Sequence, residues 1–228
     1  MKIYFVRHGH PDYSKDCLTE LGQKHAAAAA ERLKDSGIQH VFSSTMGRAW
    51  QTAEYTAKKL GVEMTPCEFM REISWGPMDD EPLLDGGHPW LLTARSIREG
   101  KSICDPDWRG SEPYRTNKFL QTTAHVIEGL DAWLEEFGYK REGDYYRVIG
   151  ENTKKTVAMF SHGTASATAF SHLFNLPLPQ VIGLISINYT CVIVVELPDR
   201  PGELVYPKLL SADAHHIVGL ETENVYGN

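Results

Sequence analysis

Short apolar runs alternate with longer stretches of helical periodicity along most of this chain. Residues 3–6 form a run of β-branched and aromatic side chains that ends shortly before a glycine, which is typical of a buried strand leaving a sheet through a tight turn. Further strands are predicted over residues 41–42, 62–65, 145–149, 156–160, 191–197 and 204–209. Helices are predicted over residues 19–37, 47–60, 116–137 and 163–174, with a short one after residue 89.

Strands that alternate with helices favour a largely parallel sheet covered on both faces. We therefore expect an α/β fold with three layers, α/β/α, around a largely parallel central sheet. Residues 150–152 predict a hairpin between the strands at 145–149 and 156–160. The alternation of strands and helices stops over about residues 73–115, and this stretch is too short and too polar to form its own core. We expect one domain, residues 1–228, with that stretch inserted over one end of the sheet.

Composition narrows the classes of partner. The formal net charge is −7 and no basic tract is present, so nucleic acid is not an expected partner. No apolar stretch approaches the roughly 20 residues that span a bilayer, and the four apolar residues before Arg7 are too few for a secretory signal. Four scattered cysteines without a Cys-x-x-Cys pair are typical of a reducing compartment. We expect a cytoplasmic protein that does not bind membranes.

Reactive side chains follow four of the predicted strands. Arg7 and His8 follow the first, Arg48 opens the helix after the second, Glu72 lies just beyond the third, and His162 follows the strand at 156–160. Because the carboxyl ends of parallel strands meet at one edge of a sheet, these side chains should line one crevice. The amino termini of the following helices favour anions there. A phosphate group is the ligand that this combination suits.

These segments resemble the motifs of the histidine phosphatase superfamily, also called the phosphoglycerate mutase-like fold. The likeness rests on Arg7-His8-Gly9, Leu18-Thr19-Glu20-Leu21-Gly22, Ser43-Ser44-Thr45-Met46-Gly47-Arg48-Ala49-Trp50-Gln51-Thr52-Ala53 and Ser161-His162-Gly163, in the family's order and spacing from residue 2 to about 175. The resemblance implies a phosphomonoester hydrolase that forms a phosphohistidine and acts on a small phosphorylated metabolite. It implies no cofactor and no metal, because arginines supply the positive charge.

The resemblance also assigns roles to individual residues. It makes His8 the nucleophile and Glu72 the general acid, while Arg7, Arg48 and His162 clamp the phosphoryl oxygens. A phosphoryl transition state spreads negative charge over its oxygens, which such donors stabilise. The two arginines should also lower the pKa of His8 and keep its attacking nitrogen unprotonated.

The chain departs from the family pattern after its first motif. Ser14 stands near a family asparagine that contacts the phosphate, and His10 replaces a family glutamate, so both are expected to contact the substrate. Around Glu72, the mutases carry Glu-Arg-x-Tyr-Gly, whereas this chain has Glu72-Ile73-Ser74-Trp75-Gly76. The arginine and tyrosine of the mutases, which this chain lacks, would favour binding of a bisphosphorylated glycerate. The sequence therefore favours a phosphatase over phosphoglycerate mutase-type transfer.

Two other functions are compatible with parts of the sequence. His8-Gly9-His10, with Asp12 and His162 as further ligands, resembles the His-x-His entry of metal-dependent hydrolases. A non-catalytic module could keep the phosphate cradle to bind a ligand.

The sequence leaves the substrate pocket and the assembly state open. Trp75, Trp90 and Trp108 could wall the substrate or pack in the core. Four cations of the inserted stretch could recognise a second acidic group or belong to an exposed helix: Arg95, Arg98, Lys101 and Arg109. Apolar residues on the last strands could form an edge-to-edge homodimer or belong to the core.

Overall fold

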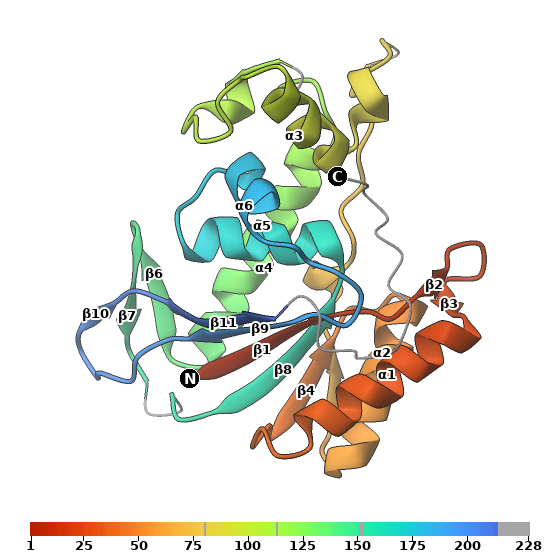
Figure 1. The fold of residues 1–228 in the computed structure, drawn as a ribbon. Helices are drawn as coiled ribbons and strands as arrows, with labels where there is room; N and C mark the ends of the chain where they lie inside the picture. The colour runs from red at the N-terminus through yellow and green to blue at the C-terminus, as the bar shows by residue number, and fades with distance from the viewer. Residues whose placement is uncertain (80, 113, 151–152, 214–228) are drawn as a thin grey trace.

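Six strands form the central sheet of the computed structural model, which describes residues 1–79, 81–112, 114–150 and 153–213 (Figure 1). Their order is β11-β9-β1-β8-β4-β5. Strands β1, β8, β4 and β5 run parallel, β9 is antiparallel to β1, and β11 is antiparallel to β9. The bounds are β1 Lys2–Arg7, β4 His40–Ser43, β5 Met64–Pro66, β8 Thr156–Ser161, β9 Val192–Glu196 and β11 Lys208–Asp213. The largely parallel sheet predicted from the sequence is confirmed.

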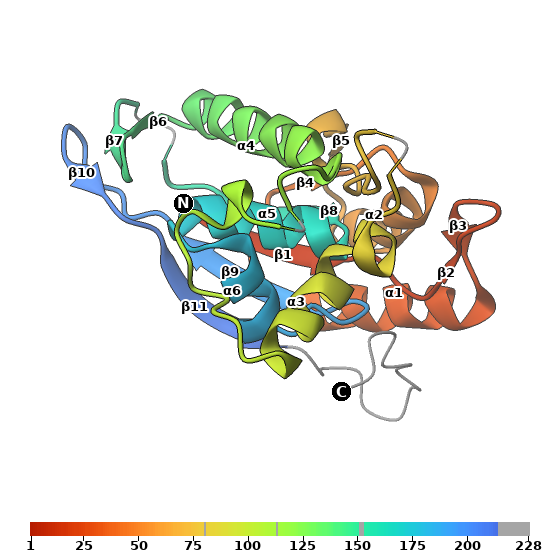
Figure 2. The same ribbon diagram turned by 90° about the horizontal axis from the view of Figure 1, so that it is seen from above.

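Helices cover both faces of this sheet (Figures 1 and 2). Helices α1 and α2 lie on one face, and α4 and α5 lie on the other, which gives the expected three layers. Helices α3 and α6 contact each other above α5. The bounds are α1 Glu20–Leu33, α2 Gly47–Leu60, α3 Pro89–Arg98, α4 Phe119–Glu136, α5 Gly163–Leu173 and α6 Leu178–Leu184. Of the described helices, none is both long and apolar enough to cross a membrane.

Alternate residues of β1 enter two separate hydrophobic clusters. Ile3 and Phe5 belong to the cluster under α4 and α5. There the rings of Phe5 and Phe170 pack edge to face, with centroids 5.0 Å apart. Val6 belongs to the cluster under α1 and α2, together with Ala53. A strand buried on both faces needs apolar side chains at successive positions, which explains the unbroken run at the start of the chain.

The predicted hairpin around residue 150 is wrong. Strand β7, Tyr145–Val148, pairs with β6, Tyr139–Glu142, and with β10, Leu204–Val205, in a second sheet. The β6–β7 turn contains Gly143, whose φ of 59° is one that glycine adopts without strain. Strand β8 instead lies between β1 and β4 in the central sheet, while residues 151–152 fall outside the described part of the chain.

The single strand predicted over residues 204–209 is two strands in the structure. Pro207 stands between β10 and β11 and has no backbone N–H to donate to a ladder. The interruption allows β10 to pair in the second sheet while β11 joins the central one.

The stretch at residues 73–115 packs against the rest of the chain. It contains α3 and two short 3₁₀ helices, Leu84–Gly87 and Trp108–Gly110. Leu92 and Trp108 belong to the same hydrophobic cluster as Phe5. The remaining short elements are the 3₁₀ helix Glu68–Met70 and the hairpin of β2, Pro11–Asp12, with β3, Cys17–Leu18.

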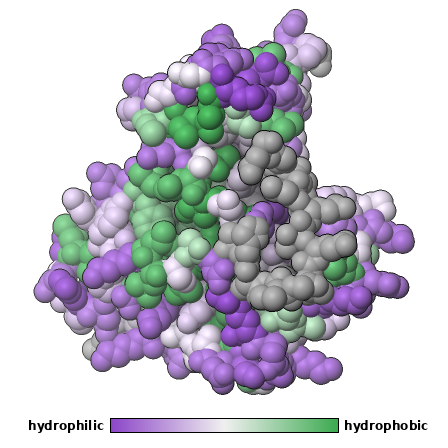
Figure 3. Space-filling model, in the orientation of Figure 1, coloured by the Kyte–Doolittle hydropathy of each residue, from purple (hydrophilic) through white to green (hydrophobic). Residues whose placement is uncertain are grey.

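One face of the molecule carries a hydrophobic surface over α6 and the strands β9 and β11 (Figure 3). The exposed apolar side chains of these elements include Leu184 of α6 and Leu209 and Leu210 of β11. Strand β11 also forms one edge of the central sheet. An edge-to-edge homodimer stays a prediction.

Candidate active site

The register of the two central strands brings His8 and His162 together. Arg7 ends β1 opposite Ser161, which ends β8, so the next residue of each strand leaves the sheet at the same point. The two imidazole centroids lie 5.2 Å apart, and both side chains are buried. The backbone N–H of Thr190 donates to the carbonyl oxygens of Arg7 at 3.1 Å and His8 at 3.3 Å, which supports this turn from behind.

The hydrogen bonds of His8 define its tautomer. Nδ1 lies 2.7 Å from the carbonyl oxygen of Gly9, which can only accept, so Nδ1 carries the hydrogen. Nε2 accepts a hydrogen bond from Nε of Arg48 at 3.3 Å. The lone pair of Nε2 therefore points toward a guanidinium group.

Burial and nearby cations lower the pKa of His8 well below its ordinary value. Desolvation is the largest cause, and the charges of Arg7 and Arg48 lower the pKa further. The hydrogen bond to Gly9 raises the pKa but does not offset these effects. His8 is neutral at physiological pH. The sequence predicted the effect of the arginines but not the larger effect of burial.

Asp16 holds Arg48 in place. Its Oδ1 accepts from Nη1 of Arg48 at 2.5 Å, and its Oδ2 accepts from the backbone N–H of Gly47 at 2.7 Å. One carboxylate thus binds both the amino terminus of α2 and the arginine of its first turn, where the helix dipole favours an anion. Asp16 has a φ of 50°, in the left-handed region, because the β2–β3 loop turns sharply there.

Arg7 and His162 each carry a buried nitrogen that no described residue bonds. Arg7 donates from Nη1 to the carbonyl oxygen of Ile187 at 2.7 Å and lies over the ring of Tyr189 at 4.4 Å, but its Nε has no described partner. His162 contacts Oγ of Ser44 through Nε2 at 2.8 Å, and its Nδ1 has no described partner. Buried polar groups are normally hydrogen-bonded, so a ligand with several oxygen atoms suits this place.

Burial also lowers the pKa of His162 well below its ordinary value, and His8, Arg48 and Arg7 add to this shift. The second imidazole is therefore neutral as well. It can contribute one N–H group to an anionic ligand without adding a formal charge.

Glu72 lies at the amino terminus of α5. Its Oε1 accepts from the backbone N–H of Ala165 at 3.0 Å, and its Oε2 accepts from that of Thr164 at 3.4 Å. Since His162 is the N-cap of the same helix, the carboxylate stands on the turn that begins at the second histidine. These contacts bring together the five residues that follow the strands, and their roles in catalysis stay predictions.

A sequence model of the histidine phosphatase superfamily, branch 1, matches residues 3–208. The chain belongs to this superfamily. Probable phosphoglycerate mutase GpmB of Erwinia tasmaniensis is 26% identical over 186 residues, which cover 78% of this chain and 76% of that protein. Probable phosphoglycerate mutase GpmB of Yersinia pestis is 33% identical over 92 residues. This match covers 36% of this chain and 43% of that protein, so the chain spans less than half of that relative.

The fold agrees with solved structures of the superfamily. The mycobacterial glucosyl-3-phosphoglycerate phosphatase aligns over 94% of this chain and 99% of its own, with a TM-score of 0.63 and 19% identity. At this identity the likeness establishes the fold alone.

The two remaining predicted substrate contacts, Ser14 and His10, form hydrogen bonds outside these five residues. Ser14 is exposed, and its hydroxyl donates to Oδ1 of Asp12 at 2.6 Å. Nδ1 of His10 lies 3.0 Å from Oγ1 of Thr19, the N-cap of α1. The His10 ring is 5.5 Å from Tyr189, so it borders the site through that ring. No described hydrogen bond joins Ser14 to the five residues, so its contact with the substrate stays a prediction.

The same contacts bear on the metal-dependent alternative. Nδ1 of His10 contacts Oγ1 of Thr19, and Oδ1 of Asp12 accepts from the Ser14 hydroxyl. Throughout the described residues, no group of three or more His, Cys, Asp or Glu side chains is arranged to hold a metal ion. The described part of the chain therefore does not assemble the ligand set that this alternative needs.

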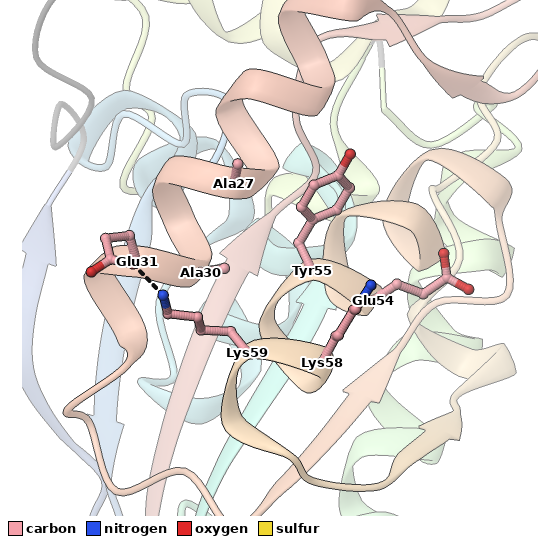
Figure 4. A pocket seen from close by; sticks show the side chains of 7 residues that line it. All are labelled: Ala27, Ala30, Glu31, Glu54, Tyr55, Lys58 and Lys59. Carbon is pink, nitrogen blue, oxygen red and sulfur yellow. Dashed lines mark ion pairs between the residues drawn. The ribbon is translucent and has the colours of Figure 1, made fainter.

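A pocket of about 650 Å³ opens beside the site. It is lined by Tyr13, Met46, Arg48, Glu72, Ile73, Ser74, Trp75 and His88. Of the three tryptophans considered from the sequence, Trp75 lines this pocket, Trp90 donates to Oγ1 of Thr164 at 3.1 Å, and Trp108 is buried in the core. A second pocket of about 770 Å³ between α1 and α2 is lined by none of the predicted site residues (Figure 4).

Sequence reasoning missed Asp16, Ser44 and Tyr189. Ser44 was visible in the motif before Arg48 but was given no role. Asp16 lies in a loop with no periodic pattern. Tyr189 packs against His8, with ring centroids 5.6 Å apart, but the two residues are about 180 positions apart in the sequence. A local signal exists only for Ser44.

The lowered pKa values of His8 and His162 predict that acid destabilises the fold. An unfolded histidine titrates near pH 6.5, so on acidification the unfolded chain binds protons that the folded chain does not. The free energy of unfolding should fall below about pH 6.5, by at most about 1.4 kcal/mol per pH unit for each histidine. Urea unfolding at about pH 7.5, 6.5 and 5.5 measures this slope.

Two variants separate the buried histidines from other groups in this measurement. His8→Asn should flatten the slope, whereas His125→Asn, on the exposed face of α4, should leave it as in the wild type. Equal slopes in the wild type and His8→Asn would contradict a neutral buried His8.

The contacts of Asp16 predict that it positions Arg48. Asp16→Ala should lower kcat/KM toward an aryl phosphate about 10- to 100-fold, because misplacement of a catalytic group by about 1 Å has effects of that size. Asp12→Ala is the matched control, since Asp12 bonds to Ser14 and Lys15 of its own loop. Melting temperatures of both variants check that the fold is kept. Equal losses in the two variants would show that Asp16 has no special role.

Proposed function

We propose that this chain is a phosphomonoester hydrolase that transfers the phosphoryl group of a small phosphorylated metabolite to His8 and then to water. The observation that carries this proposal is the neutral tautomer of His8, with Nδ1–H bonded to Gly9 and Nε2 facing Arg48. An imidazole nitrogen can attack phosphorus only when its lone pair is free of a proton. The family to which the chain belongs supports the same reaction.

In the first step, Nε2 of His8 attacks phosphorus and the bond from phosphorus to the ester oxygen breaks. The electron pair of that bond goes to the departing oxygen, which takes a proton from Glu72. As the substrate binds, Arg48 exchanges its bond to Nε2 for one to a phosphoryl oxygen, which frees the lone pair of Nε2 for this attack. Arg7 and His162 contribute the N–H groups of the two nitrogens that no described residue bonds. Removing one such donor typically lowers the rate about 100- to 1000-fold.

In the second step, water attacks the phosphorus of phosphohistidine. The Glu72 carboxylate takes one proton from this water, and the phosphorus–nitrogen bond breaks. Its electron pair returns to Nε2, so His8 regains its neutral form and inorganic phosphate leaves. The contacts of Glu72 with the amino terminus of α5 keep one carboxyl group beside both steps.

We further propose that the protein acts in the cytoplasm as one domain, on a small molecule and not on nucleic acid. The net charge of −7 and the four scattered cysteines support this setting. Leu92 and Trp108 from residues 73–115 share a hydrophobic cluster with Phe5 of the central sheet, which supports the single domain.

Phosphoglycerate mutase-type transfer is the second candidate, because the curated relatives carry that name. A mutase must keep the first product bound and return the phosphoryl group to another of its oxygens. Turnover of a phosphoglycerate without release of inorganic phosphate would favour this candidate over the phosphatase.

Removing the nucleophile tests the proposed reaction. His8→Ala should lower hydrolysis of para-nitrophenyl phosphate by more than about a thousandfold, because no other group replaces the attacking nitrogen. It should also abolish the acid-labile label that the wild type acquires from radiolabelled substrate. His125→Ala is the control for loss of a histidine outside the site. Near-normal rates in His8→Ala would refute the assignment of the nucleophile.

The protonation step tests Glu72. Glu72→Gln should lower kcat/KM for ethyl phosphate about 10- to 100-fold more than kcat/KM for para-nitrophenyl phosphate, since only the poorer leaving group needs a proton. The ratio kcat/KM is the right quantity, because it reports steps up to cleavage of the ester bond and excludes hydrolysis of phosphohistidine. Equal losses for both esters would show that another residue is the general acid. His10 and Asp79, an acidic residue that follows Glu72 in the stretch at residues 73–115, would then be tested next.

A further inference from the structure

The pocket beside the proposed phosphate site contains an aromatic wall and few charges. Among the described residues that line it, Arg48 and Glu72 are the charged side chains, and both have roles in the proposed reaction. The rest of the lining is Tyr13, Met46, Ile73, Ser74, Trp75 and His88. No described lining residue remains to pair with a second negative charge on the substrate.

Arg71 and Arg95 are not among the lining residues and have partners of their own. Arg71 donates to Oγ1 of Thr45 at 3.0 Å and pairs with Glu68 at 3.4 Å. Arg95 binds Asp85 through two nitrogens, at 2.8 and 3.0 Å.

The other cations of the inserted stretch also lie outside the lining. Arg109 lies over the ring of Trp108 and lines a different pocket. Lys101 pairs with Glu99 at 2.7 Å, and Arg98 does not line the pocket either. The sequence left open whether these cations contact a second acidic group of the substrate or belong to an exposed helix. Their placement does not support contact with the substrate.

Two aromatic side chains that line the pocket keep a large part of their surface exposed. Trp75 packs against His88 with ring centroids 4.4 Å apart and keeps 38% of its surface exposed. Tyr13 is 60% exposed and lies under the guanidinium group of Arg48 at 5.4 Å. Burial lowers the pKa of His88, so this imidazole is neutral at pH 7 and supplies no cation. Exposed aromatic faces in a concave site bind flat, uncharged groups.

We infer that the leaving group of the substrate is an uncharged aromatic alcohol, which stacks on Trp75 and Tyr13. This inference rests on the proposed phosphatase function and specifies its substrate class. A leaving group with a carboxylate or a second phosphate would meet no compensating cation among the described lining residues, because Arg48 already binds the phosphoryl group. The pocket volume of about 650 Å³ accommodates an aromatic alcohol of metabolite size.

Two esters that differ in one charge test the inference. Benzyl phosphate and para-carboxybenzyl phosphate have the same reacting centre, and the carboxylate stands at the far end of the ring. We expect kcat/KM for benzyl phosphate to exceed that for its carboxylated analogue at least about tenfold, because an unpaired charge is disfavoured in such a pocket. An equal or higher value for the carboxylated ester would overturn the inference while leaving the phosphatase function intact.

The aromatic wall has its own test with a matched tryptophan control. Trp75→Ala should lower the ratio of kcat/KM for benzyl phosphate to that for ethyl phosphate about tenfold, since the small ester cannot stack. Trp50→Ala should keep this ratio, because Trp50 lies on α2, donates to Glu54 and lines another pocket. An unchanged ratio in Trp75→Ala would remove Trp75 from the binding surface and overturn the stacking.

A designed cation provides the reverse test. Ser74→Lys should raise kcat/KM for para-carboxybenzyl phosphate relative to benzyl phosphate about tenfold. If no ester is hydrolysed, the phosphatase function fails, and calorimetry with benzylphosphonate and its para-carboxy analogue still decides the pocket chemistry. Tighter binding of the uncharged phosphonate supports the inference, and equal or tighter binding of the carboxylated one overturns it.

Discussion

The parallel, in-register pairing of β1 with β8 is the constraint on which the site depends. Because Arg7 stands opposite Ser161, each strand places its histidine at the next position, and the two imidazoles become neighbours. The same placement at the end of the two central strands leaves both rings buried. One structural feature therefore sets both the geometry and the protonation state of the proposed nucleophile.

Burial gives the site a marked electrostatic imbalance. Arg7 and Arg48 are both buried, and the more exposed Asp16 pairs with Arg48, while the Glu72 carboxyl group bonds to the amino terminus of α5. Neutral histidines add polar N–H groups without adding charge. In an environment of low polarity, cations attract a phosphoryl group far more strongly than they would in water. The same burial that makes His8 unprotonated thus also favours the charge that it attacks.

Much of the proposed phosphate-binding half was predictable, because its residues follow strands with clear apolar runs and fall in recognisable motifs. His8, Arg48 and His162 follow this rule. The rest depends on tertiary contacts that leave no local trace. Tyr189 reaches the site from a loop near the other end of the chain, and the pairing of β7 with β6 and β10 instead of β8 depends on which buried strand occupies the centre of the sheet. Ser14 was placed by analogy with the family, but its hydroxyl bonds to Asp12 of its own short loop.

The two halves of the site follow different physical constraints, and this difference limits what relatives can say about the substrate. The phosphate half is built at the ends of strands, where register, burial and helix starts admit few alternatives. The leaving-group half is built by Tyr13 of an exposed loop and by Trp75 and His88 of residues 73–115, where local structure admits many side chains. A relative can therefore keep the fold and the phosphoryl chemistry while binding another alcohol. Substrate class must be argued from the charges and rings of the second half, and in this chain those are aromatic and nearly uncharged.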